Sequence, residues 1–131
     1  MNSNINEILT IESTNKTPYI YCDKNKGLIE IKGRSNAENT NIFYGPFFNW
    51  LEKYQNDLPD KFYVNLQLEY LNSSSSNVLM SFFDKLNNLH RQQGLDVFVN
   101  WVYEEDDDDM FEHGKDLESK VDFKFNFMAI E

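Results

Sequence analysis

Hydroxyl groups are concentrated at one point of the chain, where Ser73 to Ser76 lie between Asn72 and Asn77. Serine and asparagine often begin helices, because their side chains accept hydrogen bonds from free backbone N–H groups. Such a cap uses one residue and leaves the other hydroxyls of the run unexplained. They indicate a phosphorylation site, since a phosphate at the start of a helix meets free N–H groups and the positive end of the helix dipole.

A second group of reactive side chains is the unbroken acidic run from Glu104 to Asp109. Carboxylate oxygens are the ligands that Mg²⁺ and Ca²⁺ prefer. The run lacks the alternate ligand spacing and the closing glutamate of an EF-hand, which favours a solvated loop or a partner surface. A divalent-metal-binding protein or enzyme that uses residues 104–109 is the alternative interpretation.

Other residues that could do chemistry are few. His90 and His113 are too far apart in the chain to form the two-histidine pattern of a zinc helix. Cys22 is the one cysteine, so no intrachain disulfide is possible, and its apolar surroundings predict a buried side chain. The sequence contains no nucleophile elbow, P-loop or dinucleotide-binding glycine motif. We therefore expect no catalytic residue, no metal and no cofactor, and a protein that is not an enzyme.

The spacing of apolar residues predicts the elements that position these groups. Alternation predicts a strand over 62–70, and a helical stripe predicts a helix from Asn77 to a stop at Gly94. The same reasoning predicts further strands over 7–12, 19–23, 28–32, 95–103 and 123–127, and further helices over 42–54 and 110–121. The predicted fold class is α/β, with one mixed β-sheet, the order β-β-β-α-β-α-β-α-β and a single domain over residues 1–131.

Three local signals refine this pattern. Turn-forming residues from Asp23 to Gly27 predict a hairpin between the second and third strands, and Gly33 is expected to end the third. Pro46 is expected to kink its helix or to begin a new first turn. Alternating strands and helices in the second half favour parallel pairing, which brings the carboxyl ends of the strands to one edge of the sheet. The serines and the acidic run are expected to share that edge, where Tyr70 and Tyr103 are candidate anchors for a partner.

Composition limits the classes of partner. The chain has 131 residues and a formal net charge of −10, so it repels phosphate backbones and anionic membrane surfaces. Basic protein surfaces are the partners that remain. No apolar run reaches the roughly 18 residues needed to cross a bilayer, and residues 1–7 lack the apolar region of a signal peptide. We therefore expect a cytoplasmic protein with no nucleic acid bound and no membrane insertion.

Several ordered segments match the pattern of a known family across about Leu9 to Phe127. They are Thr17-Pro18-Tyr19-Ile20; Gly33-Arg34-Ser35 with Glu38-Asn39; Phe43-Tyr44-Gly45-Pro46 with Trp50-Leu51 and Tyr54; Leu68 to Ser75; and Trp101 to Asp106 with Met110, Glu112 and Gly114. In these segments the chain resembles the SiaC family of bacterial regulatory phosphoproteins. The chain departs from the family at Asn36-Ala37, where Tyr-Pro is typical, and at Asn77, where lysine is frequent.

The resemblance implies a fold like that of anti-sigma-factor antagonists, the STAS class, and a role in partner switching. A kinase phosphorylates the hydroxyl residue after Asn72, which here is Ser73 in place of the common threonine; Ser74 and Ser75 are weaker candidates. A PP2C-type phosphatase removes the phosphate, and the unphosphorylated form binds an effector such as a diguanylate cyclase. The expected partner-binding residues are Asn72, Ser74, Tyr70, Tyr103, Glu104, Glu105 and Asp106. A constitutive scaffold that is never phosphorylated is the remaining alternative.

Overall fold

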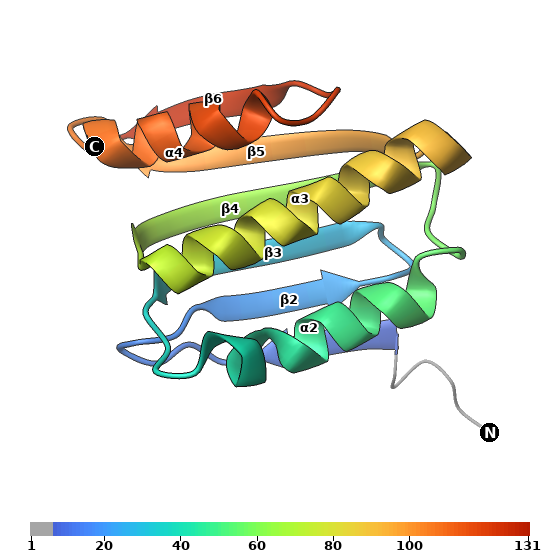
Figure 1. Ribbon diagram of the computed structural model, residues 1–131, viewed down its shortest axis with the longest axis horizontal. Coiled ribbons are helices and arrows are strands. Elements are labelled where there is room, and N and C mark those ends of the chain that lie inside the picture. Colours follow the sequence, from blue (N-terminus) through green and yellow to red (C-terminus); the bar gives the residue numbers. More distant parts are fainter. Residues whose placement is uncertain (1–6) are drawn as a thin grey trace.

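The computed structural model describes residues 7–131, which form a six-stranded sheet with three helices packed on one of its faces (Figure 1). The elements follow the order β1 (Ile8–Ile11), β2 (Tyr19–Asp23), β3 (Leu28–Ser35), α2 (Thr40–Tyr54), β4 (Lys61–Leu71), α3 (Ser73–Gln93), β5 (Asp96–Glu104), α4 (Asp108–Glu118) and β6 (Phe125–Ile130). This order and the mixed α/β class are those predicted from the sequence.

The strands lie in the sheet in the same order as in the chain. β1, β2 and β3 pair antiparallel, whereas β3, β4, β5 and β6 pair parallel. The predicted hairpin and the predicted parallel half are both confirmed. Each crossover steps in the same direction along the sheet, so right-handed connections bring all three helices to one face.

The core lies between the sheet and this helical layer. In β4, the side chains of Phe62, Val64 and Leu66 are buried beneath the helices, while Tyr63 and Gln67 alternate with them on the opposite, exposed face. The helices contribute their inner stripes to the same core, including Phe47, Leu51, Phe82, Phe83 and Leu86. The sheet is therefore covered on one face and open on the other.

Some boundaries differ from the predictions. Gly33 does not end β3: it takes a φ of 117° at an irregularity in the pairing with β4, and the ladder continues to Ser35. Pro46 does not begin a new helix, since α2 runs from Thr40 to Tyr54 with the proline inside it. β6 begins at Phe125 rather than at Phe123, because its pairing with β5 starts there.

The two helices that carry the candidate site also begin earlier than predicted. α3 starts at Ser73 and not at Asn77, so the serine run is the first turn of the helix rather than a loop before it. α4 starts at Asp108 and ends at Glu118, two to three residues ahead of the predicted range. Both starts are set by side-chain caps, Asn72 and Asp107, which periodicity of apolar residues does not reveal.

α4 lies very close to the sheet because it contacts β5 and β6 through a glycine. A Cβ atom added at Gly114 would come within 2.7 Å of ring atoms of Trp101 and Phe127. The Trp101 indole N–H also donates a hydrogen bond of 3.0 Å to the carbonyl of Met110 in the same helix. The position of α4 over the sheet therefore depends on the absence of a side chain at residue 114.

We expect Gly114→Ala to lower the free energy of unfolding by about 1–3 kcal/mol, because the new methyl group forces α4 away from Trp101. Urea denaturation followed by tryptophan fluorescence measures this change. The matched control is Glu112→Ala, an exposed position in the same helix, which should change stability by less than about 0.5 kcal/mol. Equal stability of the two variants would contradict this account of the packing.

Candidate functional site

Asn72 caps the helix that carries the serine run. Its side-chain oxygen accepts a hydrogen bond of 2.8 Å from the backbone N–H of Ser75, and its carbonyl accepts one of 3.0 Å from Ser76. The Asn72 amide group is itself held, since its Nδ2 donates to Oδ1 of Asn36 at 3.1 Å and its backbone N–H donates to the carbonyl of Ser35 at 3.1 Å. The loop after β3 therefore fixes the residue that starts α3.

The first two serines of α3 are exposed to solvent. Ser73 and Ser74 are exposed, and they occupy the first two positions of the helix. Their backbone N–H groups find no acceptor among residues 7–131. A phosphate on either hydroxyl would stand beside free N–H donors at the positive end of a 21-residue helix.

Ser75 has a different role. Its side chain is fully buried, and its hydroxyl donates to the backbone carbonyl of Ser35 at 3.0 Å while accepting from Ser35 Oγ at 2.6 Å. The Tyr44 hydroxyl lies 2.6 Å from Ser35 Oγ and is the donor there, because the Ser35 hydrogen is already used. The three hydroxyls of Ser35, Tyr44 and Ser75 form a closed buried network that joins β3, α2 and α3.

Burial of this network changes the acidity of the tyrosine. Removal from water raises the pKa of Tyr44 to about 12 from its ordinary value of 10.0. The Tyr44 phenol therefore stays neutral in the folded protein as long as the hydrogen bonds that join it to Ser35, and Ser35 to Ser75, are intact.

Sequence reasoning did not identify Ser35 and Tyr44 as parts of the site. Both residues lie in the segments that resemble the SiaC family.

Tyr70 and Tyr103, the candidate aromatic anchors, differ in accessibility. Tyr70 is 40 % exposed, and the guanidinium of Arg34 lies 4.9 Å from the centre of its ring. Tyr103 is only partly exposed and packs against Phe111 of α4, with 5.3 Å between ring centres. Tyr70 is thus available to a partner at the end of β4, whereas much of Tyr103 contributes to the packing of α4.

The acidic run divides into two parts. Glu104, Glu105 and Asp106 are exposed at the end of β5, where the Glu105 N–H donates to the carbonyl of Ile130 at 2.7 Å. Asp107 caps α4 by accepting from the N–H of Met110 at 3.0 Å, and Asp108 and Asp109 occupy the first helical turn. Acids in a first turn interact favourably with the helix dipole, which accounts for the second half of the run.

The carboxyl ends of the parallel strands meet at the left-hand edge of the sheet in Figure 1, and the starts of α3 and α4 lie there. The structure therefore brings the serine run and the acidic run to the same edge, as predicted.

Within residues 7–131, no group of three or more His, Cys, Asp or Glu side chains is arranged to hold a metal ion. No helix in that range is long and apolar enough to cross a bilayer.

The single cysteine of the chain, Cys22, does not contribute to this site. Cys22 is fully buried in β2, and burial raises the pKa of its thiol far above the ordinary range. A thiol held in its neutral form is a poor nucleophile and a poor metal ligand. The prediction of a buried cysteine is confirmed.

The fold and this edge define a two-layer α/β protein of STAS-like architecture that presents exposed serine hydroxyls at a strand-to-helix junction. Residues 11–130 match the model of the SiaC family of regulatory phosphoproteins. The chain belongs to the SiaC family. This bears out the resemblance inferred from the sequence segments.

Solved structures and a curated sequence show the same relationship. SiaC of Pseudomonas aeruginosa has 29 % sequence identity and a TM-score of 0.85, with 94 % of this chain and 98 % of that chain covered. A chain in the crystal structure of the diguanylate cyclase SiaD in complex with its activator SiaC, also from Pseudomonas aeruginosa, has 29 % identity and a TM-score of 0.85, with coverages of 93 % and 99 %. An uncharacterized protein of Pseudomonas aeruginosa is 30 % identical over 121 residues, which are 92 % of this chain and 95 % of that protein.

Removal of the Ser75 hydroxyl tests the buried network. We expect Ser75→Ala to lower the free energy of unfolding by about 1–3 kcal/mol, because the Ser35 hydroxyl loses its acceptor in a site that water does not reach. The matched control is Ser74→Ala, one residue away and exposed, with an effect below about 0.5 kcal/mol. Chemical denaturation of both variants measures the difference. If the two changes have the same effect, the network does not stabilise the start of α3.

The raised pKa of Tyr44 predicts a dependence on alkaline pH. An unfolded tyrosine loses its proton near pH 10 and the folded one near pH 12, so stability is lost across that window as the pH rises. We expect wild type to lose about 2–3 kcal/mol more than Tyr44→Phe between these two values. Denaturation curves at a series of alkaline pH values provide the measurement. Parallel curves for wild type and Tyr44→Phe would contradict the prediction.

Proposed function

We propose that this protein is a non-enzymatic regulatory phosphoprotein of a partner-switching circuit, acting as one SiaC-like domain over residues 1–131. A cognate kinase phosphorylates Ser73, and a PP2C-type phosphatase removes the phosphate. The state of Ser73 controls binding to an effector protein such as a diguanylate cyclase, and the unphosphorylated form binds. The circuit operates in the cytoplasm, where a protein kinase finds its ATP.

The observation that carries this proposal is the exposed hydroxyl of Ser73 at the first position of α3, directly after a cap held by the loop that follows β3. Of the four serines, Ser73 and Ser74 are exposed and Ser75 is fully buried. A kinase can therefore reach Ser73 without unfolding the helix. Its place after Asn72 is the one that the family resemblance gives to the acceptor.

The effector class is supported by a relative. The solved complex of the diguanylate cyclase SiaD with its activator SiaC contains a chain of this fold at 29 % identity. The residues proposed to meet the effector lie around the carboxyl edge of the sheet, on both sides of α3's start. They are Asn72, Ser74, Tyr70, Tyr103, Glu104, Glu105 and Asp106.

The energetics favour a switch that acts at the interface rather than on the fold. A phosphate at an exposed helix start stabilises the helix by only about 0.3–1 kcal/mol. A partner that covers Ser73 would have to strip water from a group carrying a charge of about −1.5 to −2, which costs several kcal/mol unless the partner provides matched donors. Phosphorylation should therefore leave the structure intact and weaken the complex.

Charge variants of Ser73 test the proposal directly. We expect Ser73→Ala to bind a diguanylate cyclase from the same organism as tightly as the unphosphorylated wild type, and Ser73→Asp to bind at least about tenfold more weakly, a loss of about 1.4 kcal/mol. Isothermal titration calorimetry with the purified cyclases measures both affinities.

Ser13 provides the control, because it is an exposed serine outside the residues proposed to meet the effector. Ser13→Ala and Ser13→Asp should each bind more nearly like wild type than Ser73→Asp does. Wild-type affinity in both Ser73 variants would reject the switch. Intact-mass measurement of protein from its native cells separates the switch from a constitutive scaffold, since a scaffold has no phosphorylated fraction.

A further inference from the structure

The sheet has two edge strands, β1 and β6, and β6 lacks the usual protection of an edge strand. Native sheets guard their edges with charged residues, prolines or bulges, because unpaired backbone groups there attract further strands. The residues of β6, Phe125 to Ile130, include no charge and no proline, and their pairing with β5 is regular. Charged residues nevertheless make up 26 % of the chain. Figure 1 shows β6 along the upper edge of the sheet, with α4 in front of it.

The backbone of β6 offers hydrogen-bonding groups on its outer side. Successive residues of a paired strand direct their N–H and C=O groups alternately toward and away from the neighbouring strand. The carbonyl of Ile130 accepts from the Glu105 N–H at 2.7 Å, so the backbone groups of Ile130 and Met128 face β5. Those of Phe127 and Ala129 therefore face outward, and no loop or side-chain group of residues 7–131 pairs with them.

α4 covers only the beginning of this outer side. The N–H of Phe125 also points outward, where the carboxylate of Glu118 in α4 accepts it at 2.8 Å. Further along β6 the Phe127 side chain is half-buried and the Ala129 side chain is exposed. The outward N–H and C=O groups of Phe127 and Ala129, which we call the β6 edge, can form four hydrogen bonds with an added strand.

Charge selects the direction in which a second copy of this strand pairs. Lys124 precedes β6 and Glu131 follows it, and neither has an ion-pair partner among residues 7–131. Antiparallel pairing places the lysine of each copy at the end where the other copy's glutamate lies, whereas parallel pairing sets like charges side by side. β1 has only four residues and is flanked by Glu7 and Glu12, so it offers neither the length nor the complementary charge.

The side chains of β6 select the register. With Met128 opposite its own copy, each Phe127 lies opposite Ala129 of the other strand, so a large ring faces a methyl group and the outward backbone groups meet. A register one step earlier needs the N–H of Phe125, which is already bonded to α4. A register one step later places Phe127 opposite the charged Glu131. The Met128 register is therefore the one that pairs apolar residues with apolar residues.

The helical layer leaves room for this pairing. Gly114 of α4 lies against both Trp101 of β5 and Phe127 of β6, which are partners in the sheet, so α4 lies above the space between these two strands. Paired strands are about 4.8 Å apart, so the α4 helices of two copies would lie about 10 Å from each other. That distance is an ordinary packing distance of helices.

We propose that two copies of this protein pair their β6 strands antiparallel about a two-fold axis at Met128, which joins their sheets into one. Each copy uses the same surface, so the contact closes on itself as a dimer. Strands of this length pair over about 20 Å, which makes the interface small and reversible. The inference does not depend on the state of Ser73, and it stands or falls separately from the proposed function.

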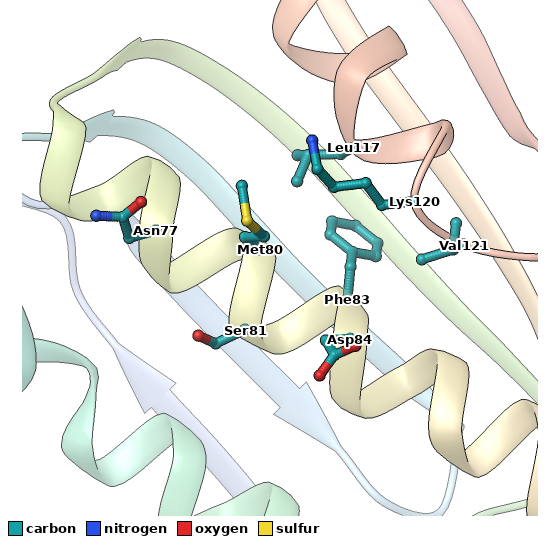
Figure 2. A pocket seen from close by; sticks show the side chains of 8 residues that line it. All are labelled: Asn77, Met80, Ser81, Phe83, Asp84, Leu117, Lys120 and Val121. Carbon is teal, nitrogen blue, oxygen red and sulfur yellow. The ribbon is translucent and has the colours of Figure 1, made fainter.

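Cysteine crosslinking tests the register. Met128→Cys should form an intermolecular disulfide under mild oxidation, because residues at a non-hydrogen-bonded antiparallel position have Cα atoms about 4.5 Å apart, which a disulfide can span. The native Cys22 is fully buried and does not compete. Two controls have similar exposure: Met80→Cys in the groove between α3 and α4 (Figure 2), and Phe98→Cys on the open face of the sheet. Both should remain largely uncrosslinked.

The pattern of crosslinks separates the possible contacts. Crosslinking of Phe98→Cys as fast as Met128→Cys would mean that the sheets stack face to face, and it would overturn the β6 pairing. Faster crosslinking of Met80→Cys would place the contact on the helical layer and overturn it equally.

Sedimentation tests the association without crosslinks. It is measured at physiological ionic strength, where a Debye length of about 8 Å limits the repulsion between two chains of net charge −10. We expect the wild type to show a concentration-dependent monomer–dimer equilibrium. A wild type that remains monomeric up to about 1 mM would overturn the inference.

Variants at Ala129 test the backbone contact. Ala129→Pro removes an outward N–H and leaves the bonds to β5 in place, so it should abolish the dimer. Ala129→Ser keeps the N–H and nearly the same size, and it should dimerise within about twofold of wild type. A folded Ala129→Pro variant that dimerises like wild type would exclude the β6 edge.

A charge exchange gives a test that does not depend on proline, since it changes only exposed side chains. Lys124→Glu should weaken the dimer severalfold, and adding Glu131→Lys in the same chain should restore it. Thermal unfolding of these variants should match that of wild type. A dimer that is unchanged by Lys124→Glu and by the double change would overturn the antiparallel arrangement.

Discussion

The start of α3 is fixed by hydrogen bonds from three other parts of the chain, and the display of Ser73 depends on them. Asn72 caps the helix while the loop after β3 holds its amide at 3.1 Å. One turn further in, Ser75 is locked to Ser35, which in turn accepts from Tyr44 of α2. These bonds are buried or partly buried, where an unpaired group is costly, so the first turn has one well-defined arrangement.

That arrangement explains how adjacent serines can differ in their surroundings. A helix turns by about 100° per residue, so successive hydroxyls point in different directions. Ser75 points into the molecule and joins the network, whereas Ser73 and Ser74 remain exposed. The modification proposed for Ser73 would therefore leave undisturbed the hydroxyls that hold the helix in place.

The one-sided sheet gives this protein two unlike surfaces. On the open face, the side chains of Glu30, Asn65, Asn100 and Asn126 bond to one another across four strands. On the helical face, α3 lies between its neighbours with few charges on its outer side and with a groove along the α4 side. Exposed apolar side chains occur on both surfaces, with Tyr63, Phe98 and Met128 on the open face and Met80 on α3.

The sequence by itself determined the order of elements, the hairpin, the parallel half and the edge where the serines and acids meet, because these follow from local periodicity and turn chemistry. It also placed Asn72 at the strand-to-helix junction. Only the tertiary structure decided where α3 and α4 begin, that Gly33 continues β3, and that Ser75 is buried. The capping bonds of Asn72 and Asp107 are local, but several residues of each run could cap, so the sequence did not fix which one does. The bulge and the buried network depend on partners distant in the chain, such as Ser35 for Ser75, and no local pattern encodes which residues will meet.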